Sequence, residues 1–189
     1  MKILLLDNYD SFTFNLFQLV GEVGGIVPDV IRNDKIALED VAKYDKILLS
    51  PGPGIPVEAG VMPDIVKHYA ATKSILGVCL GHQCIGEIFG ATLENMPKVC
   101  HGFGLQTFVT IEDEKLFRDV PKNFDSGRYH SWTVSNVDFP DDLEITANDD
   151  QNRVMALRHK NYDVRGIQFH PESVLTPQGA VIMRNWLNL

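Results

Sequence analysis

Several features that mark membrane, secreted and nucleic-acid-binding proteins are absent from this sequence of 189 residues. No run of about 18 apolar residues occurs, which is the length that a membrane-spanning helix needs. Three cysteines are too few, and odd in number, for a disulfide framework, and they fit a reducing compartment. Lys and Arg form no basic run, and the formal net charge is −8, which disfavours binding to a phosphate backbone. We therefore expect no membrane and no nucleic acid among the partners.

The amino-terminal segment, MKILLLD, is apolar but lacks the pattern of a secretory signal. Asp7 and Asp10 interrupt it, and no small-residue cleavage site follows. It predicts a buried strand in a cytoplasmic protein. The chain also has no internal repeat, no low-complexity tract and no long linker, so residues 1–189 are expected to form one domain.

Apolar segments alternate with amphipathic ones in the first 90 residues. The apolar segments predict strands at residues 2–6, 27–31, 46–49 and 74–78, and the amphipathic ones predict helices at 11–23, 38–43, 60–71 and 83–90. Asp10 or Ser11 is expected to cap the first helix, and Gly24-Gly25 to end it. This alternation indicates a parallel sheet covered on both faces, with ligands bound beyond the carboxyl ends of its strands.

The pattern changes after Gly90. Short segments rich in Val, Ile, Phe and Thr predict strands at 106–111, 143–147, 154–159 and 164–169, and a helix at 178–189 follows. These strands are expected to pair antiparallel. The predicted fold is α/β: a flavodoxin-like, open and mostly parallel central sheet flanked by helices, with a smaller antiparallel β portion in the C-terminal half.

The stretch Gly77-Val78-Cys79-Leu80-Gly81 stands between a predicted strand and a predicted helix. G-x-C-x-G at such a junction is the cysteine counterpart of the nucleophile elbow, in which glycines allow a sharp turn. The helix end favours a thiolate at Cys79, and the N–H of Leu80 can stabilise an oxyanion. The alternative is a small buried cysteine in a tight turn.

Two further motifs follow predicted strands. Gln168-Phe169-His170-Pro171-Glu172 supplies an imidazole as general base and a carboxylate to orient it, although a surface histidine beside a carboxylate would have the same sequence. Ser50-Pro51-Gly52-Pro53-Gly54 is either a simple turn or a stiff loop whose amides donate to the same oxyanion.

A metal clip or a redox pair within GVCLGHQC is disfavoured. Cys79, His82 and Cys84 fall short of the four ligands of a structural zinc site, and C-x4-C is not the C-x-x-C of redox pairs. We expect no metal site. Five residues of helix carry Cys84 away from Cys79, so Cys84 is expected to pack against the sheet, and His82 is not expected to be the base.

Together, GVCLGHQ, SPGPG, RYHS and QFHPES resemble the class I glutamine amidotransferases over essentially the whole chain. The opening LLLDNYDSFTFNL resembles the branch that serves chorismate-using synthases. The resemblance implies that Cys79 attacks L-glutamine, that His170 transfers the proton and that Glu172 orients His170. It also implies an oxyanion site at Leu80 and the Gly52-Pro53-Gly54 loop, where Pro53 has no N–H, so Gly52 or Gly54 donates.

The resemblance further implies that Gln83 and the backbone of Ser131 and Trp132 hold the amino-acid end of glutamine. Ammonia would pass to a chorismate-using synthase large subunit, of anthranilate synthase first, or alternatively of aminodeoxychorismate synthase or both. No cofactor is expected in this subunit, whereas the partner is expected to depend on Mg²⁺. A gamma-glutamyl peptide hydrolase, which could use the same triad, is the alternative from another class.

Three residues depart from the family pattern: Cys84 replaces a small residue such as alanine, Trp132 a common leucine, and Phe103 a frequent lysine. A backbone contact survives the first two changes. The third lies in residues 101–107, whose role in the partner interface the sequence leaves open.

Overall fold

The computed structural model covers residues 1–189 and describes every side chain except those of residues 97–100. Within this described part, a nine-stranded sheet has the order β2-β1-β3-β4-β9-β8-β7-β5-β6. Five strands are parallel: β1 (Ile3–Asp7), β2 (Asp29–Arg32), β3 (Lys46–Leu49), β4 (Ser74–Val78) and β9 (Val164–Ile167). Four continue the sheet antiparallel: β8 (Val154–His159), β7 (Leu143–Asn148), β5 (Leu93–Val109) and β6 (Asn123–Val134).

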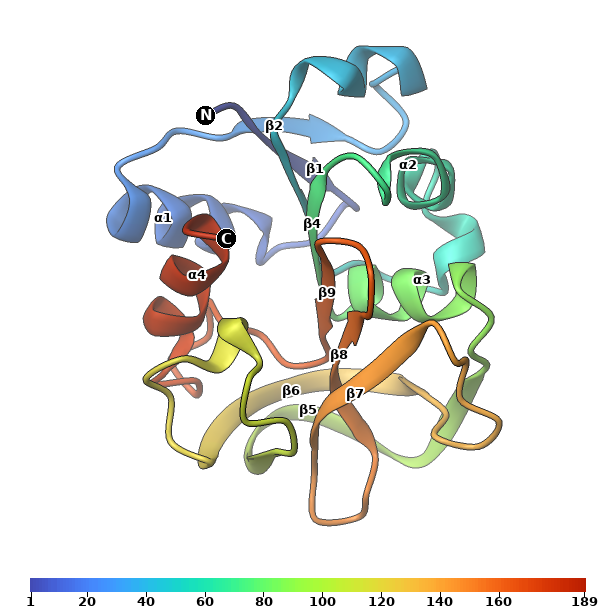
Figure 1. Cartoon of the computed structure of the whole chain (residues 1–189), viewed down its shortest axis with the longest axis vertical. Helices are drawn as coiled ribbons and strands as arrows, with labels where there is room; N and C mark the ends of the chain where they lie inside the picture. Colours follow the sequence, from blue (N-terminus) through green and yellow to red (C-terminus); the bar gives the residue numbers. More distant parts are fainter.

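Helices cover both faces of the parallel strands (Figure 1). The helices α1 (Thr13–Gly24) and α4 (Gly179–Leu187) lie on one face, and α2 (Met62–Tyr69) and α3 (Leu80–Ile88) lie on the other. Three short 3-10 helices complete the fold: η1 (Leu38–Lys43), η2 (Pro56–Glu58) and η3 (Lys115–Phe117). None of the described helices is both long and apolar enough to cross a lipid bilayer.

Alternation of side chains along the buried strands divides the core into two layers. In β1, Leu4 and Leu6 belong to the cluster that contains α2 and α3, whereas Ile3 and Leu5 belong to the cluster that contains α1 and α4. Successive side chains of a strand point to opposite faces, so a continuous apolar run serves both layers. The apolar runs of the sequence are explained by this double burial.

The α/β class, with helices on both faces, is confirmed, but the predicted proportions of the sheet are wrong. Four strand pairings are parallel and four are antiparallel, so the antiparallel portion is not the smaller one. The error began at β9, which was expected to pair antiparallel. It pairs parallel with β4 and antiparallel with β8, and thereby joins the two portions.

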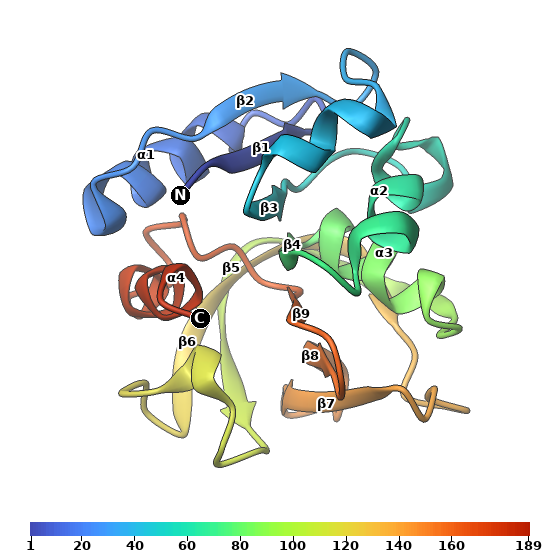
Figure 2. The same cartoon turned by 45° about the horizontal axis from the view of Figure 1, so that its top comes forward.

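The strand pair β5–β6 was predicted only in part. The structure extends β5 from 106–111 back to Leu93, and β6 was missed entirely. Both strands lie at the opposite side of the sheet from β2 and curve strongly (Figures 1 and 2). A register shift between His101 and Phe103 contributes to this curvature, because a bulge bends a strand.

Helix boundaries also differ from expectation. The first helix begins at Thr13, and neither Asp10 nor Ser11 caps it, because the N-cap is Phe12 and makes no side-chain bond. Gly25, in the left-handed conformation, ends it as predicted. The helix predicted from Gln83 begins three residues earlier, at Leu80, directly after the turn at Cys79.

Candidate active site

Cys79 occupies a strained turn between β4 and α3. Its φ of 53° and ψ of −100° lie outside the regions that side chains with a Cβ normally adopt. The flanking glycines make the turn possible: a Cβ on Gly77 would overlap the carbonyl group of Gly81, and a Cβ on Gly81 would lie 2.7 Å from the Leu49 oxygen. Leu80 begins α3, so its N–H has no acceptor within the helix.

The parallel register of β4 and β9 brings two segments that are far apart in the sequence together at this turn. Val78 pairs with Ile167, and the N–H of Cys79 donates to the Ile167 carbonyl at 2.9 Å. The residues that follow β9 therefore emerge beside the thiol. This is how QFHPES reaches GVCLGHQ.

His170 and Glu172 form a buried pair beyond the end of β9. Nδ1 of His170 lies 2.7 Å from Oε1 of Glu172, and both side chains are at most 2% exposed. Nε2 of His170 has no hydrogen-bond partner among the described residues, which leaves it available for proton transfer. Burial lowers the pKa of His170, but favourable interactions of the imidazolium with the Cys79 thiolate and the Glu172 carboxylate outweigh it and raise this pKa to about 10.

Two aromatic rings hold the imidazole of His170. The ring of Tyr129 lies 4.8 Å from it and that of Phe12 lies 5.3 Å from it, both edge to face. The rings of Phe12 and Tyr129 also contact each other, at 5.1 Å. Sequence reasoning missed both residues, although they lie within the quoted DNYDSFTFN and RYHS segments.

A cavity of about 170 Å³ opens at the thiol. Seven of the residues predicted for the site line it: Gly52, Pro53, Gly54, Cys79, Gln83, Ser131 and Trp132. Tyr129 and His130 line it too and were not predicted. Leu80 lines the neighbouring cavity of about 380 Å³ instead, together with Pro53.

The SPGPG loop packs against the start of α3. A Cβ on Gly52 would lie 2.7 Å from Cδ2 of Leu80 and 2.7 Å from Cβ of Asn8. Gly54 has a φ of +73°, and a Cβ there would overlap the Glu58 carboxylate. Both glycines are therefore required by close approach or by backbone conformation, and they keep this loop beside the turn at Cys79.

Side-chain amides connect the thiol with the wall of the cavity. Nε2 of Gln83 donates to the Trp132 carbonyl at 2.8 Å and to Oε1 of Gln168 at 3.1 Å. Nε2 of Gln168 in turn lies 3.6 Å from Sγ of Cys79. Nδ1 of His130 also donates to the Trp132 carbonyl, at 2.8 Å, so this oxygen is occupied within the protein.

The neighbouring cysteine and histidine of GVCLGHQC are buried in the core. Cys84 packs in the cluster with α2 and α3 as predicted, and burial raises the pKa of its thiol. His82 is fully buried, neither of its ring nitrogens has a partner among the described residues, and burial lowers its pKa to about 3. Among the described side chains, no group of three or more His, Cys, Asp and Glu is arranged to hold a metal ion.

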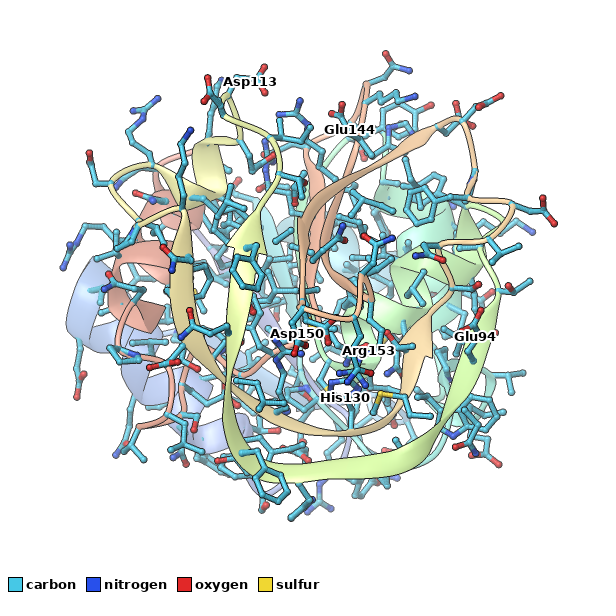
Figure 3. All side chains as sticks on the ribbon, turned by 90° about the horizontal axis from the view of Figure 1, so that it is seen from below. Glu94, Asp113, His130, Glu144, Asp150 and Arg153 are labelled. Atoms are coloured by element: carbon cyan, nitrogen blue, oxygen red, sulfur yellow. The ribbon has the colours of Figure 1, made fainter. Side chains whose placement is uncertain are left out.

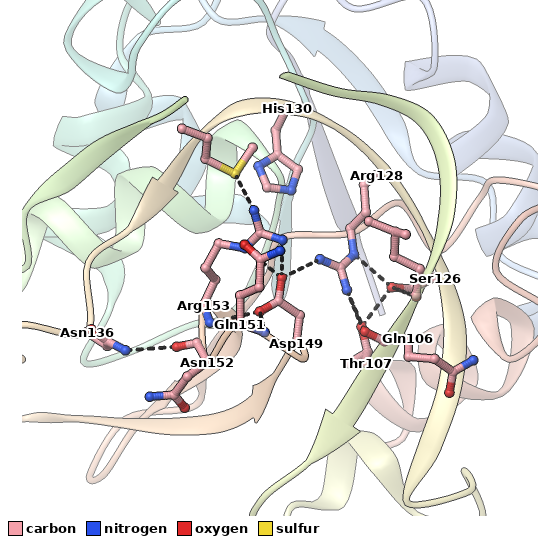
Figure 4. A network of polar contacts seen from close by, with 12 residues as sticks. Gln106, Thr107, Ser126, Arg128, His130, Asn136, Asp149, Gln151, Asn152 and Arg153 are labelled. Carbon is pink, nitrogen blue, oxygen red and sulfur yellow. Dashed lines mark hydrogen bonds and ion pairs between the residues drawn. The ribbon is translucent and has the colours of Figure 1, made fainter. Parts of the chain in front are cut away.

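A buried polar network connects β6 with β5 and with the turn between β7 and β8 (Figure 4). Arg128 donates to the Gln106 carbonyl at 2.9 Å and lies 3.4 Å from Asp149, which also pairs with Arg153. Figures 3 and 4 show Arg153 close to His130. The turn between β7 and β8 is thereby tied to the strand that carries Tyr129 and His130.

Comparison with known proteins identifies the family. The family model described as "Glutamine amidotransferase class-I" matches residues 4–189. Anthranilate synthase component 2 of Porphyra purpurea is 47% identical, over 98% of each chain, and that of Mycobacterium tuberculosis is 44% identical, over 99% of this chain and 82% of its own. A crystal structure from Thermoplasma acidophilum, assigned provisionally to a GMP synthase, superimposes with a TM-score of 0.88 at 26% identity, over 100% of this chain and 92% of its own. This chain belongs to the class-I glutamine amidotransferase family.

Proposed function

We propose that this chain is the glutaminase subunit of anthranilate synthase, which releases ammonia from L-glutamine for a chorismate-using partner in tryptophan biosynthesis. The observation that carries the chemistry is the buried 2.7 Å contact between His170 and Glu172, beside the strained turn at Cys79. Similarity over the whole chain to two proteins named anthranilate synthase component 2 supports the choice of partner.

In the first half of the reaction, Nε2 of His170 takes the thiol proton, and the resulting thiolate of Cys79 attacks the side-chain amide carbon of glutamine. The carbonyl oxygen becomes an oxyanion, which accepts hydrogen bonds from the N–H of Leu80 and from Gly52 or Gly54. His170 then protonates the amide nitrogen, the C–N bond breaks and ammonia leaves. The raised pKa of His170 favours the protonated imidazole that this step needs.

In the second half, His170 removes a proton from water, whose oxygen attacks the glutamyl thioester. The C–S bond breaks, the thiol is restored and glutamate leaves. Glu172 keeps Nδ1 of His170 protonated throughout, so that Nε2 is the nitrogen that gains and loses the proton.

The cavity beside Cys79 fits a free amino acid better than a peptide. Its volume of about 170 Å³ is below the roughly 300–1,000 Å³ of pockets for drug-sized ligands. Oε1 of Gln83 would accept a hydrogen bond from the α-ammonium group, because both hydrogens of its Nε2 are already donated. The backbone of Ser131 and Trp132 completes the site for the amino-acid end.

The remaining assignments follow from this function. Residues 1–189 act as one amidotransferase domain that docks on the chorismate-using large subunit in the cytoplasm. The family generally needs no cofactor, so the Mg²⁺ requirement is assigned to the partner. Phe103 is 52% exposed, which suits an apolar contact with that partner in the 101–107 segment.

The decisive experiment measures product formation by the chain copurified with its chorismate-using partner, with either glutamine or an ammonium salt. Cys79→Ser is expected to reduce glutamine-dependent anthranilate formation by at least about a thousandfold and to leave ammonium-dependent formation intact. Cys84→Ala is the matched control, because Cys84 lies in the core away from the cavity, and it should retain both activities.

Two results would change the assignment. Loss of both activities in Cys79→Ser would mean that the residue supports the partner structurally and not chemically. Aminodeoxychorismate as the product, in place of anthranilate, would transfer the chain to the alternative partner while leaving the triad chemistry as described.

A further inference from the structure

Gln168 is a fully buried amide that stands two residues before His170 and directly after β9. Its backbone N–H donates to the Met155 carbonyl at 2.8 Å, which fixes it to β8. Its side chain lies between the thiol of Cys79, at 3.6 Å, and the amide of Gln83, at 3.1 Å. It therefore touches both the nucleophile and a residue of the substrate cavity.

The hydrogen bonds of the neighbours determine which end of this amide faces the thiol. Gln83 donates one Nε2 hydrogen to the Trp132 carbonyl and the other to Gln168, so the atom of Gln168 nearest Gln83 must be its oxygen. The nitrogen of Gln168 is consequently directed at Sγ of Cys79. An amide nitrogen has hydrogens and no acceptor, so this contact can only be N–H donation to sulfur.

Donation of this kind acts on the two protonation states of Cys79 differently. A hydrogen bond to a charged group is stronger than one to its neutral form, so an N–H aimed at sulfur favours the thiolate. Unlike His170, the amide does not titrate, so it can hold Sγ in place in every step. Its oxygen at the same time fixes Gln83 with Oε1 left for the substrate.

We infer that Gln168 is a positioning residue of the glutaminase reaction. It stabilises the Cys79 thiolate, and it fixes the position of the substrate-binding amide of Gln83 relative to that thiolate. The inference rests on the proposed function of Cys79 and Gln83. A purely structural amide in the core would affect stability alone. The pH dependence of thiol alkylation and the split between kcat and KM therefore distinguish the two roles.

The first test follows alkylation of Cys79 by iodoacetamide as a function of pH in the full chain. Gln168→Met keeps the length of the side chain and removes both hydrogen bonds, and it is expected to move the alkylation midpoint up by about one pH unit. Gln168→Glu places a carboxylate beside Sγ and should raise the alkylation midpoint further. Cys79 and Cys84 share the tryptic peptide 74–98, so fragment ions must be used to separate them.

The matched control is Asn185→Leu. Asn185 is likewise an amide with two hydrogen bonds, to the carbonyls of Leu116 and Arg118, but it lies on α4 and does not line the cavity at the thiol. Its loss should lower stability and leave the midpoint for Cys79 unchanged.

The second test separates the two contacts of Gln168 in steady-state glutamine hydrolysis. Gln168→Glu keeps an oxygen for Gln83, so kcat should fall about tenfold or more while KM stays near the wild-type value. Gln168→Met removes both contacts, so kcat should fall and KM should rise.

Unchanged alkylation midpoints in both folded variants, with wild-type kcat, would overturn the inference. If the wild-type chain with its partner shows no glutamine hydrolysis, the proposed function fails instead. The alkylation test remains informative in that case, because it depends only on the thiol.

Discussion

At Cys79 the backbone has a φ of 53°, a left-handed value that costs a residue with a Cβ atom about 1–3 kcal/mol. The glycines on either side provide the space for this turn, but Cys79 itself bears the strain. The cost is linked to the chemistry, because the same turn projects Sγ beside His170 and leaves the N–H of Leu80 without a helical acceptor.

The strain at residue 79 can be measured by comparing two inactive variants. Glycine adopts a positive φ without penalty, so Cys79→Gly should be more stable than Cys79→Ala by about 1 kcal/mol. The order should reverse at Cys84, inside α3, where alanine is favoured over glycine by a similar amount. Urea unfolding of the four variants checks both signs. Alanine more stable at both positions would show that the turn at Cys79 carries no strain.

Sequence motifs predicted His170 and Glu172, and the family resemblance implied Ser131 and Trp132, but neither pointed to the rings that pack on His170. His170 and Glu172 are two residues apart at the end of an apolar strand, so their pairing was visible in the chain itself. Phe12 and Tyr129 contact His170 only through tertiary packing. Gln168 was within a quoted motif, but its role depends on the register between β4 and β9.

Among the elements, β9 determines whether the site is assembled. It was recognised as a strand from its apolar residues, but the sequence carries no signal for the strand beside which it inserts. Close packing of β9 against α3 explains why residue 166 is a glycine. A Cβ on Gly166 would lie 2.6 Å from Nδ1 and 3.1 Å from Cα of His82 on α3. The helix therefore lies closer to β9 than any larger residue would permit.

Gly166→Ala is expected to destabilise the chain by about 1–3 kcal/mol, because β9 and α3 must move apart. Glutamine hydrolysis should fall with it, since the same movement separates Cys79 from His170. Gly104→Ala on β5 is the control: the nearest atom to its Cβ is 3.9 Å away, in ordinary contact, so little change is expected. Thermal unfolding of both variants tests this, and equal melting temperatures would contradict the close packing of β9.

For the molecule as a whole, burial of neutral histidines sets the response to acid. Burial lowers the pKa of His82 to about 3 and that of His130 to about 4. An unfolded histidine has a pKa of about 6.5, so between pH 6.5 and about 4 the unfolded chain binds more protons than the folded chain at these two sites. Their contribution to stability is complete above pH 6.5 and is lost as the pH falls through this window.

These two sites should therefore lower the unfolding free energy by up to about 2.7 kcal/mol per pH unit near pH 5, which corresponds to two protons. His82→Asn should roughly halve this slope, whereas His68→Gln, at an exposed position of α2, should leave it unchanged. Urea titrations between pH 4.5 and 7 measure the slope. An identical slope in the wild type and in His82→Asn would exclude His82 as a source of the acid sensitivity.

The insertion of β9 between the two portions of the sheet has a consequence for synthesis of the chain. Gln168 follows Cys79 by 89 residues, so the ribosome exposes the thiol well before the residues that lie beside it in the fold. The pairings among β1 to β4 involve residues that are already made at that stage, whereas α4, which packs beside α1, is not. The proposed site is therefore incomplete until the last central strand has been made, and a nascent chain is expected to release no ammonia before then.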